Sequence, residues 1–325
     1  MAANSWDSFE KSKKALEDKP AVSYFERYSS PHTHPGGSVL RTLLQKTRVL
    51  VNFFIRRLAQ GPGRQQALQP LAELAGSAAG KDVLVIGSGP SATAVTAREV
   101  AKRQKAGELI VVATNYFLSS PLATSITPDY LVWSDSVFSP MNRQHNAKAW
   151  EALESHPSVT VVAPWTWRSV ITTMTLAERF VYFDNDTVEG WSSNVSPLKP
   201  RGYQGSTGVK ALAVALHLSP KQVFVIGLDL SYFQQFSVDA DNRVLRQPTH
   251  MKNTDSGVQD IGKDGVNGIA DTLYSTANQF LALRTHFTGR NIINLDPHSL
   301  VDAFPKVTEH PLVKKSGRKS AAAAN

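Results

Sequence analysis

The stretch VLVIGSGPS, residues 83–91, decides the fold. Four apolar residues run directly into Gly-Ser-Gly-Pro-Ser, and the sequence after Ser91 has a helical pattern. A buried strand that enters a glycine-rich turn and then a helix is typical of a nucleotide-binding α/β unit, because the amides that open the helix can face a phosphate or a ribose. The first question is therefore which ligand lies against this turn.

The pattern around this stretch indicates an α/β fold. From Lys81 onward, apolar runs of four to six residues alternate with helical segments, which predicts a Rossmann-like, mostly parallel sheet with helices on both faces. The predicted strands are 83–86, 109–113, 130–133, 159–163, 223–227 and 291–295. The predicted helices are about 91–105, 142–154, 207–217, 268–287 and 298–304. We expect irregular chain at 178–205 and at 231–267, and loops of that length usually act as lids or binding elements.

Three parts of the chain are expected from these patterns. Residues 1–80 form an N-terminal extension, 81–305 the Rossmann-like catalytic domain with a lid at about 231–267, and 306–325 a basic, disordered tail. Within the extension, apolar residues recur at three- and four-residue steps over 38–60, and arginines occupy the other face. This helix either packs on the core with a solvated basic side or lies on an anionic membrane surface.

The composition excludes cysteine chemistry and argues against a membrane-spanning or secreted protein. The 325 residues include no cysteine, which excludes disulfides, thiolate catalysis and cysteine-bound metal and agrees with a reducing cytoplasm. No apolar run approaches the ~18 residues of a membrane span, and the N-terminus lacks a secretory signal. The net charge of +8 concentrates in the helix at 38–60 and in KKSGRKS at 314–320, neither of which follows a nucleic-acid motif. We expect a cytoplasmic protein, peripheral on the inner face of the membrane, that binds no nucleic acid.

The glycine turn itself leaves several ligands open. Gly87, Gly89 and Ala92 match the G-x-G-x-x-A dinucleotide pattern, but the second strand ends in Thr114 and Asn115 where an acidic residue should hold a ribose. That disfavours a nicotinamide or flavin cofactor, and the missing Lys-Ser/Thr pair excludes a P-loop. Two roles remain for the glycines. They either let a phosphate or ribose approach the backbone, or simply allow a tight turn from strand to helix.

Other polar residues should reach the same edge of the sheet. Asn115 closes the second strand with an amide that can both donate and accept, and Ser134 and Asp135 follow the third strand. The segment 205–208, Gly-Ser-Thr-Gly, opens an apolar helix and offers hydroxyls and free amides to a carboxylate or phosphate. Ordinary N-capping by its hydroxyls is the alternative.

Four of these segments, in this order, resemble glycosyltransferase family 42, the bacterial sialyltransferases, and more distantly the motility-associated nonulosonate transferase and MptE-like pterin pyrophosphokinase domains. They are GSGPS at 87–91, ATNYF at 113–117, GSTGVKALAVAL at 205–216 with VIGLDLSYF at 225–233, and NLDPHSLVDAF at 294–304. The resemblance covers about 220 residues, from Lys81 to Phe304. It implies a GT-A-type variant of the Rossmann-like fold with a flexible lid, a CMP-activated nine-carbon acidic sugar as donor substrate, a glycan or glycolipid acceptor, no cofactor and no required metal.

The resemblance also assigns donor-binding residues. Gly89, Pro90 and Ser91 match the family's turn against the nucleotide, whereas Ser88 stands where relatives have an asparagine that contacts the phosphate. Asn115 matches an asparagine that touches the nucleotide sugar. By the same resemblance, the helix start at 206–208 receives the carboxylate of the donor. Gln204 stands where the family has an arginine, and Lys210 or Arg201 could supply the missing positive charge. The full predicted set is Gly87, Ser88, Gly89, Pro90, Ser91, Asn115, Ser134, Asp135, Ser206, Thr207, Gly208, Asp229, Pro297, His298 and Ser299.

Catalysis in the family is direct displacement with inversion, in which a lid histidine removes the acceptor proton and tyrosines donate to the departing phosphate. His250 is the one histidine of the lid-like segment, and a group with a pKa near 6.5 suits this role. Tyr232 lies near the family's phosphate-contacting tyrosine, with Tyr203 as a second candidate. The sequence Asp-Asn-Asp at 184–186 is the one formal match to a metal-binding D-x-D, and it falls in a predicted loop, so no metal site is expected.

Three functions remain in competition on the sequence alone. The first is an inverting, metal-independent glycosyltransferase of polysaccharide biosynthesis that uses CMP-sialic acid or a related keto acid sugar such as Kdo. The second is ATP-dependent pterin pyrophosphoryl transfer, with magnesium on Asp135, Asp184 or Asp229. The third is a non-catalytic module that binds a membrane surface. The acceptor, the linkage and the oligomeric state stay open, and the first reading requires that the glycine turn and the helix start near Ser206 share one cleft.

Overall fold

The computed structural model describes residues 39–187, 194–203, 205–241, 243–247, 259–260 and 265–314. The chain divides into two compact units, residues 1–63 and 64–325. Helix α3, Val39–Glu73, runs through the boundary between them. It is longer than the predicted helix at 38–60, because it continues through Gly61-Pro62-Gly63, and Ala67, Leu68 and Leu71 are buried in its last turns.

The second unit is built on a seven-stranded sheet in which every neighbouring pair is parallel. The strand order is β10-β6-β1-β2-β3-β4-β5. The strands are β1 Asp82–Ile86, β2 Leu109–Thr114, β3 Tyr130–Val132, β4 Thr160–Pro164, β5 Phe180–Phe183, β6 Gln222–Ile226 and β10 Ile292–Asn294. The chain moves outward from β1 to β5 and then returns to the other side of β1 with β6. In a parallel sheet, ligands bind at the carboxyl edge beside such a switch point, here between β1 and β6.

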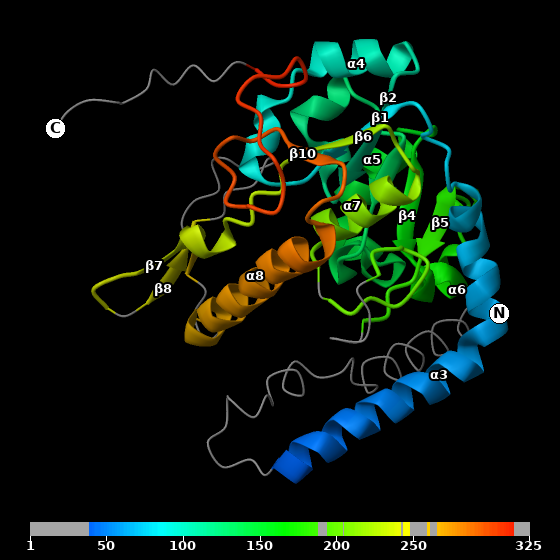
Figure 1. Cartoon of the computed structure of the whole chain (residues 1–325), viewed down its shortest axis with the longest axis vertical. Helices are drawn as coiled ribbons and strands as arrows, with labels where there is room; N and C mark the ends of the chain where they lie inside the picture. The colour runs from blue at the N-terminus through cyan, green and yellow to red at the C-terminus, as the bar shows by residue number, and fades with distance from the viewer. Residues whose placement is uncertain are drawn as a thin grey trace. The chain divides into compact units, whose positions relative to one another are not determined.

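Helices cover both faces of the sheet (Figure 1). Leu84 and Ile86 share one buried cluster with α4, Ala97–Lys105, and α5, Ala147–Glu154. The alternate residues of β1, 83 and 85, share the other cluster with α7, Thr207–His217, and α8, Gly265–Phe287. This alternation confirms the predicted fold class, since each strand sends successive side chains to opposite faces.

Large aromatic side chains fill the core next to the carboxyl end of β3. The Trp133 ring lies 5.2 Å from that of Phe138 and 4.9 Å from that of Trp150, and Trp150 lies 6.1 Å from Phe180. All four are almost fully buried. Such rings bury more apolar area than any other side chains, so they fix this end of β3 firmly.

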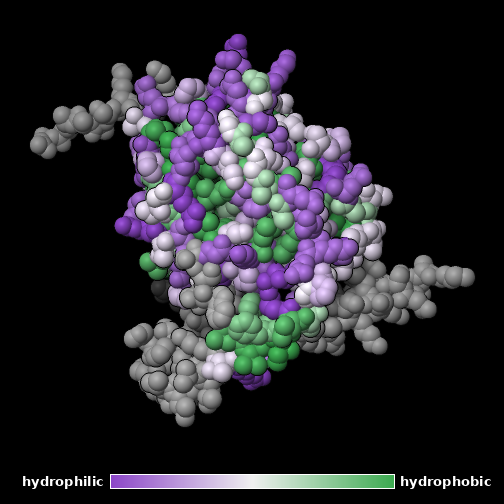
Figure 2. Space-filling model, turned by 45° about the vertical axis from the view of Figure 1, so that its right-hand side comes forward, coloured by the Kyte–Doolittle hydropathy of each residue, from purple (hydrophilic) through white to green (hydrophobic). Residues whose placement is uncertain are grey.

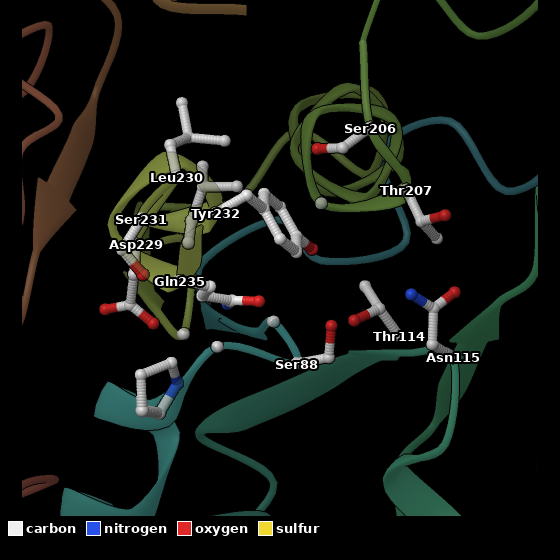
Figure 3. A pocket seen from close by; sticks show the side chains of 16 residues that line it. Ser88, Thr114, Asn115, Ser206, Thr207, Asp229, Leu230, Ser231, Tyr232 and Gln235 are labelled. Atoms are coloured by element: carbon white, nitrogen blue, oxygen red, sulfur yellow. The ribbon is translucent and has the colours of Figure 1, made fainter. Parts of the chain in front are cut away.

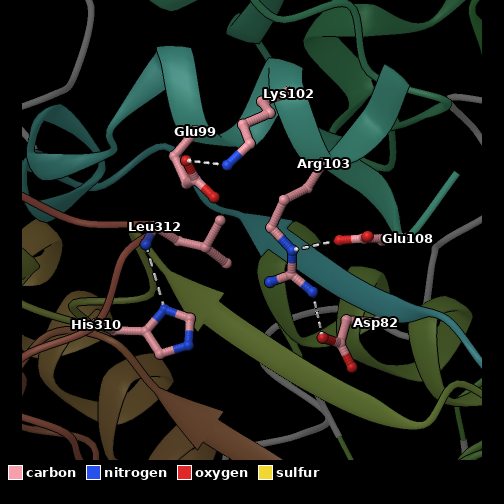
Figure 4. Close-up of polar contacts among 7 residues, drawn as sticks. All are labelled: Asp82, Glu99, Lys102, Arg103, Glu108, His310 and Leu312. Atoms are coloured by element: carbon pink, nitrogen blue, oxygen red, sulfur yellow. Dashed lines mark hydrogen bonds and ion pairs between the residues drawn. The ribbon is translucent and has the colours of Figure 1, made fainter. Parts of the chain in front are cut away.

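Polar contacts fasten the opposite, amino-terminal edge of the sheet (Figure 4). Arg103 of α4 binds Asp82, the first residue of β1, at 2.6 Å and Glu108, just before β2, at 3.6 Å. Nearby, the amide of Leu312 donates to His310 Nδ1 at 3.3 Å. Residues 306–314, predicted to belong to the tail, therefore pack on the unit, and Leu312 is fully buried.

Several predicted elements differ from the observed ones. The region predicted to be irregular at 178–205 contains β5, a short edge strand of four apolar or aromatic residues. The helix predicted at 298–304 is wrong: the segment forms turns, in which the hydroxyl of Ser299 accepts from the Val301 amide. The helix predicted from 91 is divided into a 3-10 turn, η1 Pro90–Ala94, and α4, because Val95 and Thr96 pair with the C-terminal segment instead. The helix predicted at 142–154 likewise begins as the 3-10 turn η5, Pro140–Asn146, and becomes α-helical at α5.

The predicted lid segment holds a small antiparallel sheet. It follows the 3-10 turn η8, Tyr232–Gln235, and consists of β7 Phe236–Val238, β8 Val244–Arg246 and β9 Gln259–Asp260. Remaining short elements are η2 Phe117–Ser119, η3 Pro121–Thr124, η4 Ser136–Phe138, η6 Trp165–Trp167, α6 Arg168–Ile171 and η7 Ala177–Arg179. Within the described ranges, no helix combines the length and apolar character that crossing a bilayer requires.

The turns that leave β1 and β6 are in direct contact. Gly87 N–H donates to the Ile226 carbonyl at 2.8 Å, and Gly89 N–H donates to the Gly227 carbonyl at 2.9 Å. A Cβ on Gly87 would lie 2.2 Å from the Gly227 carbonyl oxygen, and one on Gly227 would lie 2.5 Å from that of Gly87. Gly227 also has a φ of +75°. Only glycine at both positions lets the two turns approach this closely.

Replacing Gly227 by alanine should therefore destabilise the fold strongly. The positive φ costs about 1 kcal/mol, and crowding in a packed interior adds about 1–3 kcal/mol, so we expect Gly227→Ala to lower the free energy of unfolding by about 2–4 kcal/mol. Gly107 is the matched control, because its φ is +72° but nothing lies within 4 Å of a Cβ there. Urea denaturation of both variants measures the difference, and equal losses would contradict the close-contact explanation.

Candidate functional site

A cleft opens at the switch point, on the carboxyl edge of the sheet (Figure 3). It encloses about 470 Å³, counting the solvent at its mouth. Its walls come from the turn after β1, the end of β2, the start of α7 and the segment after β6. The lining residues are Gly87, Ser88, Gly89, Pro90, Thr114, Asn115, Ser206, Thr207, Gly208, Gly227, Leu228, Asp229, Leu230, Ser231, Tyr232 and Gln235. The glycine turn and the helix start near Ser206 therefore share one cleft, as the sequence-based hypothesis requires.

The turn after β1 uses most of its amides within the protein. Besides the bonds of Gly87 and Gly89 to the β6 side, Ser91 N–H donates to Asp229 Oδ2 at 3.3 Å. In return, Gly227 N–H donates to Ser91 Oγ at 2.9 Å. These amides hold the two turns together rather than pointing at a phosphate. The predicted amide cradle is therefore not available from them, and close packing of the turns explains both Gly87 and Gly89.

Asn115 lines the cleft and has an unused side-chain acceptor. Its backbone has a φ of +53°, a conformation that asparagine tolerates better than most residues. The Asn115 N–H donates to the Val132 carbonyl at 3.2 Å, and Trp133 Nε1 donates to the Asn115 carbonyl at 3.0 Å. Its side-chain Oδ1 is buried and has no hydrogen-bond partner among the described residues. A buried polar atom without a partner is costly, which makes it a natural contact for a ligand.

The start of α7 is uncapped. Ser206 occupies the N-cap position, but its hydroxyl caps no amide, and its buried Oγ has no partner in the part of the chain that the structure describes. Thr207 directs its hydroxyl to Ser134 Oγ at 2.7 Å instead. The first-turn N–H groups of an α-helix lack intrahelical partners and carry partial positive charge. The N-capping alternative is thus wrong for Ser206, and this helix start has the donors that an anion requires.

Two titratable side chains give the cleft its electrostatic character. Burial raises the pKa of Asp229 to about 6; hydrogen bonds from Ser91 lower it, and the side chain of Asp296 raises it further. The pKa of Tyr232 is raised, first by burial, with Arg246 opposing the rise and Asp229 among the groups that add to it. Tyr232 therefore keeps its proton at neutral pH and can donate to a ligand oxygen.

Six predicted donor-binding residues do not line the cleft. Ser91 and Ser134 stand directly behind it, bonded to the lining residues described above. Asp135 caps η4 by accepting from the Val137 amide at 3.2 Å. Ser299 is buried behind the β6 turn, with its hydroxyl 3.5 Å from the Leu228 carbonyl. Pro297 and His298 lie in the same turn as Ser299, and His298 is exposed.

His250 and Gln204 lie outside the described residues, so the predicted base has no structural context. Conversely, six residues that line the cleft were not predicted from the sequence: Thr114, Gly227, Leu228, Leu230, Ser231 and Gln235. Five of them directly follow β6 or end β2, and knowledge of the strand order would have placed them at the switch point. Gln235 has no such signal; it comes to the cleft in η8, where its Oε1 accepts from Arg246 Nε at 3.2 Å.

A second polar cluster lies at the carboxyl end of β5. Asp184 is fully buried and paired with Arg64 at 2.9 Å. Arg201 and Lys210 each place their charge 5.9 Å from the centre of the Phe183 ring. Neither Arg201 nor Lys210 lines the cleft. The positive charge that one of them could supply in place of the family arginine, where this chain has Gln204, is therefore not among the lining residues. Among the described residues, no group of three or more His, Cys, Asp or Glu side chains could hold a metal ion.

Comparison with known proteins finds only distant similarity. No protein-family model and no curated protein matches the chain. Among solved structures, it is similar to the MAf glycosyltransferase from Magnetospirillum magneticum AMB-1, with a TM-score of 0.37 and 14% sequence identity. The match covers 70% of this chain and 34% of that one, so this chain spans about a third of that protein's length. This likeness is too distant to bear on function.

Lys210 makes stability depend on pH in a defined direction. Burial, together with the charge of Arg201, lowers its pKa from 10.5 to about 7, against a smaller opposing effect of Asp135. Between these values the unfolded chain binds more protons than the folded one, so the free energy of unfolding rises with pH. Lys210→Met removes this dependence. We expect the variant to exceed the parent protein in stability near pH 7 and to lose that advantage toward pH 10.

Thermal denaturation across this pH range measures the effect. Lys148→Met, which removes an exposed cation on α5, is the matched control. A stability difference between Lys210→Met and the parent that stays constant with pH would show that the ammonium is not held in a desolvated site.

Proposed function

We propose that the cleft binds an anionic, nucleotide-activated sugar and that the protein transfers this sugar to a glycan or glycolipid acceptor. The proposed donor is CMP-sialic acid or a related CMP-linked keto acid sugar. One observation carries the proposal: two buried polar atoms, Asn115 Oδ1 and Ser206 Oγ, have no partner among the described residues and belong to residues that line one cleft at the start of α7. The resemblance of four sequence segments to the bacterial sialyltransferases supports the choice of donor.

Each wall of the cleft has a proposed task. The α7 start, with Ser206, receives the carboxylate or phosphate of the donor, because its N–H groups and the helix dipole favour negative charge. Asn115 Oδ1 accepts from a hydroxyl of the ribose or the sugar. Tyr232 donates to the phosphate as it departs, since its raised pKa keeps the hydroxyl protonated. The close-packed turns after β1 and β6 form the floor.

The proposed reaction is a single displacement with inversion. The acceptor hydroxyl attacks the anomeric carbon, the bond from that carbon to the phosphate oxygen breaks, and CMP leaves with the electron pair. The acceptor proton passes to a base, for which His250 is the residue that the sequence resemblance suggests. No metal ion takes part in this scheme, because Tyr232 and the α7 start together offset the charge of the leaving phosphate.

A second candidate is magnesium-dependent pyrophosphoryl transfer from ATP to a pterin. The observation that favours it is the proximity of Asp229 to Asp296, whose side chain raises the pKa of Asp229, because Mg²⁺ is often held by one or two carboxylates together with substrate phosphates. Asp184 and Asp135 are otherwise engaged, the first with Arg64 and the second as a cap. ATP-dependent stabilisation that disappears with EDTA would favour this candidate.

Ligand binding provides the first test. We expect CMP, CMP-sialic acid or CMP-Kdo to raise the melting temperature. Ser206→Ala should weaken the binding of the stabilising ligand about tenfold, since a hydrogen bond to a charged group contributes about 1.5–3 kcal/mol, and Asn115→Gly should weaken it about two- to tenfold, since a bond to a neutral hydroxyl contributes about 0.5–1.5 kcal/mol. Glycine is chosen at position 115 because it tolerates the positive φ. Ser139→Ala removes a buried serine hydroxyl outside the cleft and is the control. Absence of stabilisation by all three ligands would refute the proposed donor class.

Affinity should also depend on the protonation of Asp229. An anionic ligand in the same cleft is repelled by the ionised carboxylate of Asp229. The affinity for the ligand should therefore fall as the pH rises through about 6, the pKa of Asp229 in the folded protein. In Asp229→Asn this dependence should disappear. CMP-sialic acid is the suitable ligand, because a phosphodiester does not titrate in this range, whereas a monophosphate has a second pKa of about 6. Calorimetric titrations at several pH values decide, and a parent affinity that is constant across pH 6 would contradict the proposed contact.

A further inference from the structure

Helix α3 carries an exposed apolar stripe in its N-terminal half. Val51, Ile55 and Leu58 are 49%, 60% and 81% exposed, and their spacing of four and three residues places them on one helix face. Phe53, on the opposite face, is only 7% exposed. Hydrophobic side chains gather at the surface of α3 in Figure 2. An exposed row of large aliphatic side chains on a helix is unusual unless something covers it.

The stripe gives way to polar residues in the C-terminal half of the helix. The positions that continue the same face after Gly63 are Gln66, Gln69 and Glu73, as the helical repeat of 3.6 residues requires. Gln69 Nε2 donates to Glu73 Oε1 at 3.0 Å on that polar continuation. Toward the C-terminus, the apolar face therefore ends at Leu58 and does not continue along the last turns of the helix.

The charged residues of the helix itself, up to Ala72, all have one sign. Residues 39–72 of α3 include no Asp or Glu, and the first acidic residue is Glu73. The basic residues of the helix are Arg41, Lys46, Arg48, Arg56, Arg57 and Arg64. Arg48 precedes Val51 by one helical turn, and both Arg48 and Arg56 are exposed. Along α3, the apolar stripe is accompanied by basic residues and by no acidic residue before Glu73. This combination is complementary to a surface whose interior is apolar and whose outer layer is anionic.

These observations select one occupant among three. A second copy of the helix would bring like charges together, which disfavours self-association through this face. A nucleic acid would match the charge but leave the aliphatic side chains uncovered. A bilayer with anionic headgroups satisfies both, because apolar side chains enter the acyl boundary while arginines stay among the phosphates.

We propose that the segment Arg48–Leu58 of α3 docks on the surface of an anionic lipid bilayer, with Val51, Ile55 and Leu58 inserted and the helix lying in the plane of the interface. The segment is too short and too charged to cross the bilayer, so the attachment is peripheral. This inference does not depend on the proposed function of the cleft.

Vesicle sedimentation of the full chain tests the inference. We expect binding to vesicles of phosphatidylcholine with phosphatidylglycerol, weak binding to vesicles of phosphatidylcholine alone, and a loss of affinity as salt increases. The double variant Ile55→Glu/Leu58→Glu should bind at least about tenfold more weakly, because two apolar anchors are removed and two anionic charges are added. Gln66→Glu/Gln69→Glu makes the same charge change on the polar continuation of the same face and should retain binding within about threefold.

Several results would overturn the inference. They are absence of binding of the parent chain to either vesicle, equal binding to both vesicles, and equal affinity of the stripe variant and the parent. Circular dichroism and thermal melting of each variant establish that loss of binding is not loss of folding. Light scattering adds a further outcome: a dimer that Ile55→Glu/Leu58→Glu converts to a monomer, with vesicle binding unchanged, would assign the stripe to a second copy of the chain instead.

Discussion

The backbone contact between the turns after β1 and β6 is the constraint on which the candidate site depends. Gly87 and Gly89 donate across it, and Gly227 donates back to Ser91, so the two turns form one unit at the switch point of the sheet. The contact sets the floor of the cleft and holds Asp229 over the β1 turn through the Ser91 amide. The side walls, Asn115 and the α7 start, then face each other across a fixed base.

This arrangement changes how a glycine-rich turn is interpreted. In a dinucleotide-binding fold the glycines admit a pyrophosphate to the backbone. Here a Cβ at position 87 or 89 would first meet the neighbouring turn, at 2.2 Å from Gly227 and 1.8 Å from Asp229 respectively. The same G-x-G-x-x-A pattern can thus arise from protein packing alone, and anion recognition has to come from elsewhere. The start of α7 is the element that offers it, because the Ser206 hydroxyl caps no amide and has no partner in the described part of the chain.

Much of the fold could be predicted from the sequence, because buried parallel strands are continuous apolar runs and their crossover helices have a clear period. β5 was missed because FVYF is short and lies at the sheet edge. The site was harder to predict. The sequence predicted that Gly87–Pro90 and Ser206–Gly208 lie together, because the carboxyl ends of parallel strands share one edge of the sheet. It did not predict which groups bond to the amides of the turn after β1, because that depends on which strands are neighbours. Ser91, Ser134 and Asp135 accordingly turned out to support the cleft wall or a nearby turn, a distinction that residue type cannot make.

The bond from Trp133 Nε1 to the Asn115 carbonyl joins the cleft to the aromatic core. The indole sits within 4.9 Å of Trp150 and stacks on Phe138, so it has no freedom to follow a displaced carbonyl. Any shift of the Asn115 backbone that accompanies occupancy of the cleft must therefore lengthen or bend this bond and alter the polarity around the ring. The fluorescence of the buried Trp133 indole should therefore respond to occupancy of the cleft, because its Nε1–H is hydrogen-bonded to the Asn115 backbone in the cleft wall.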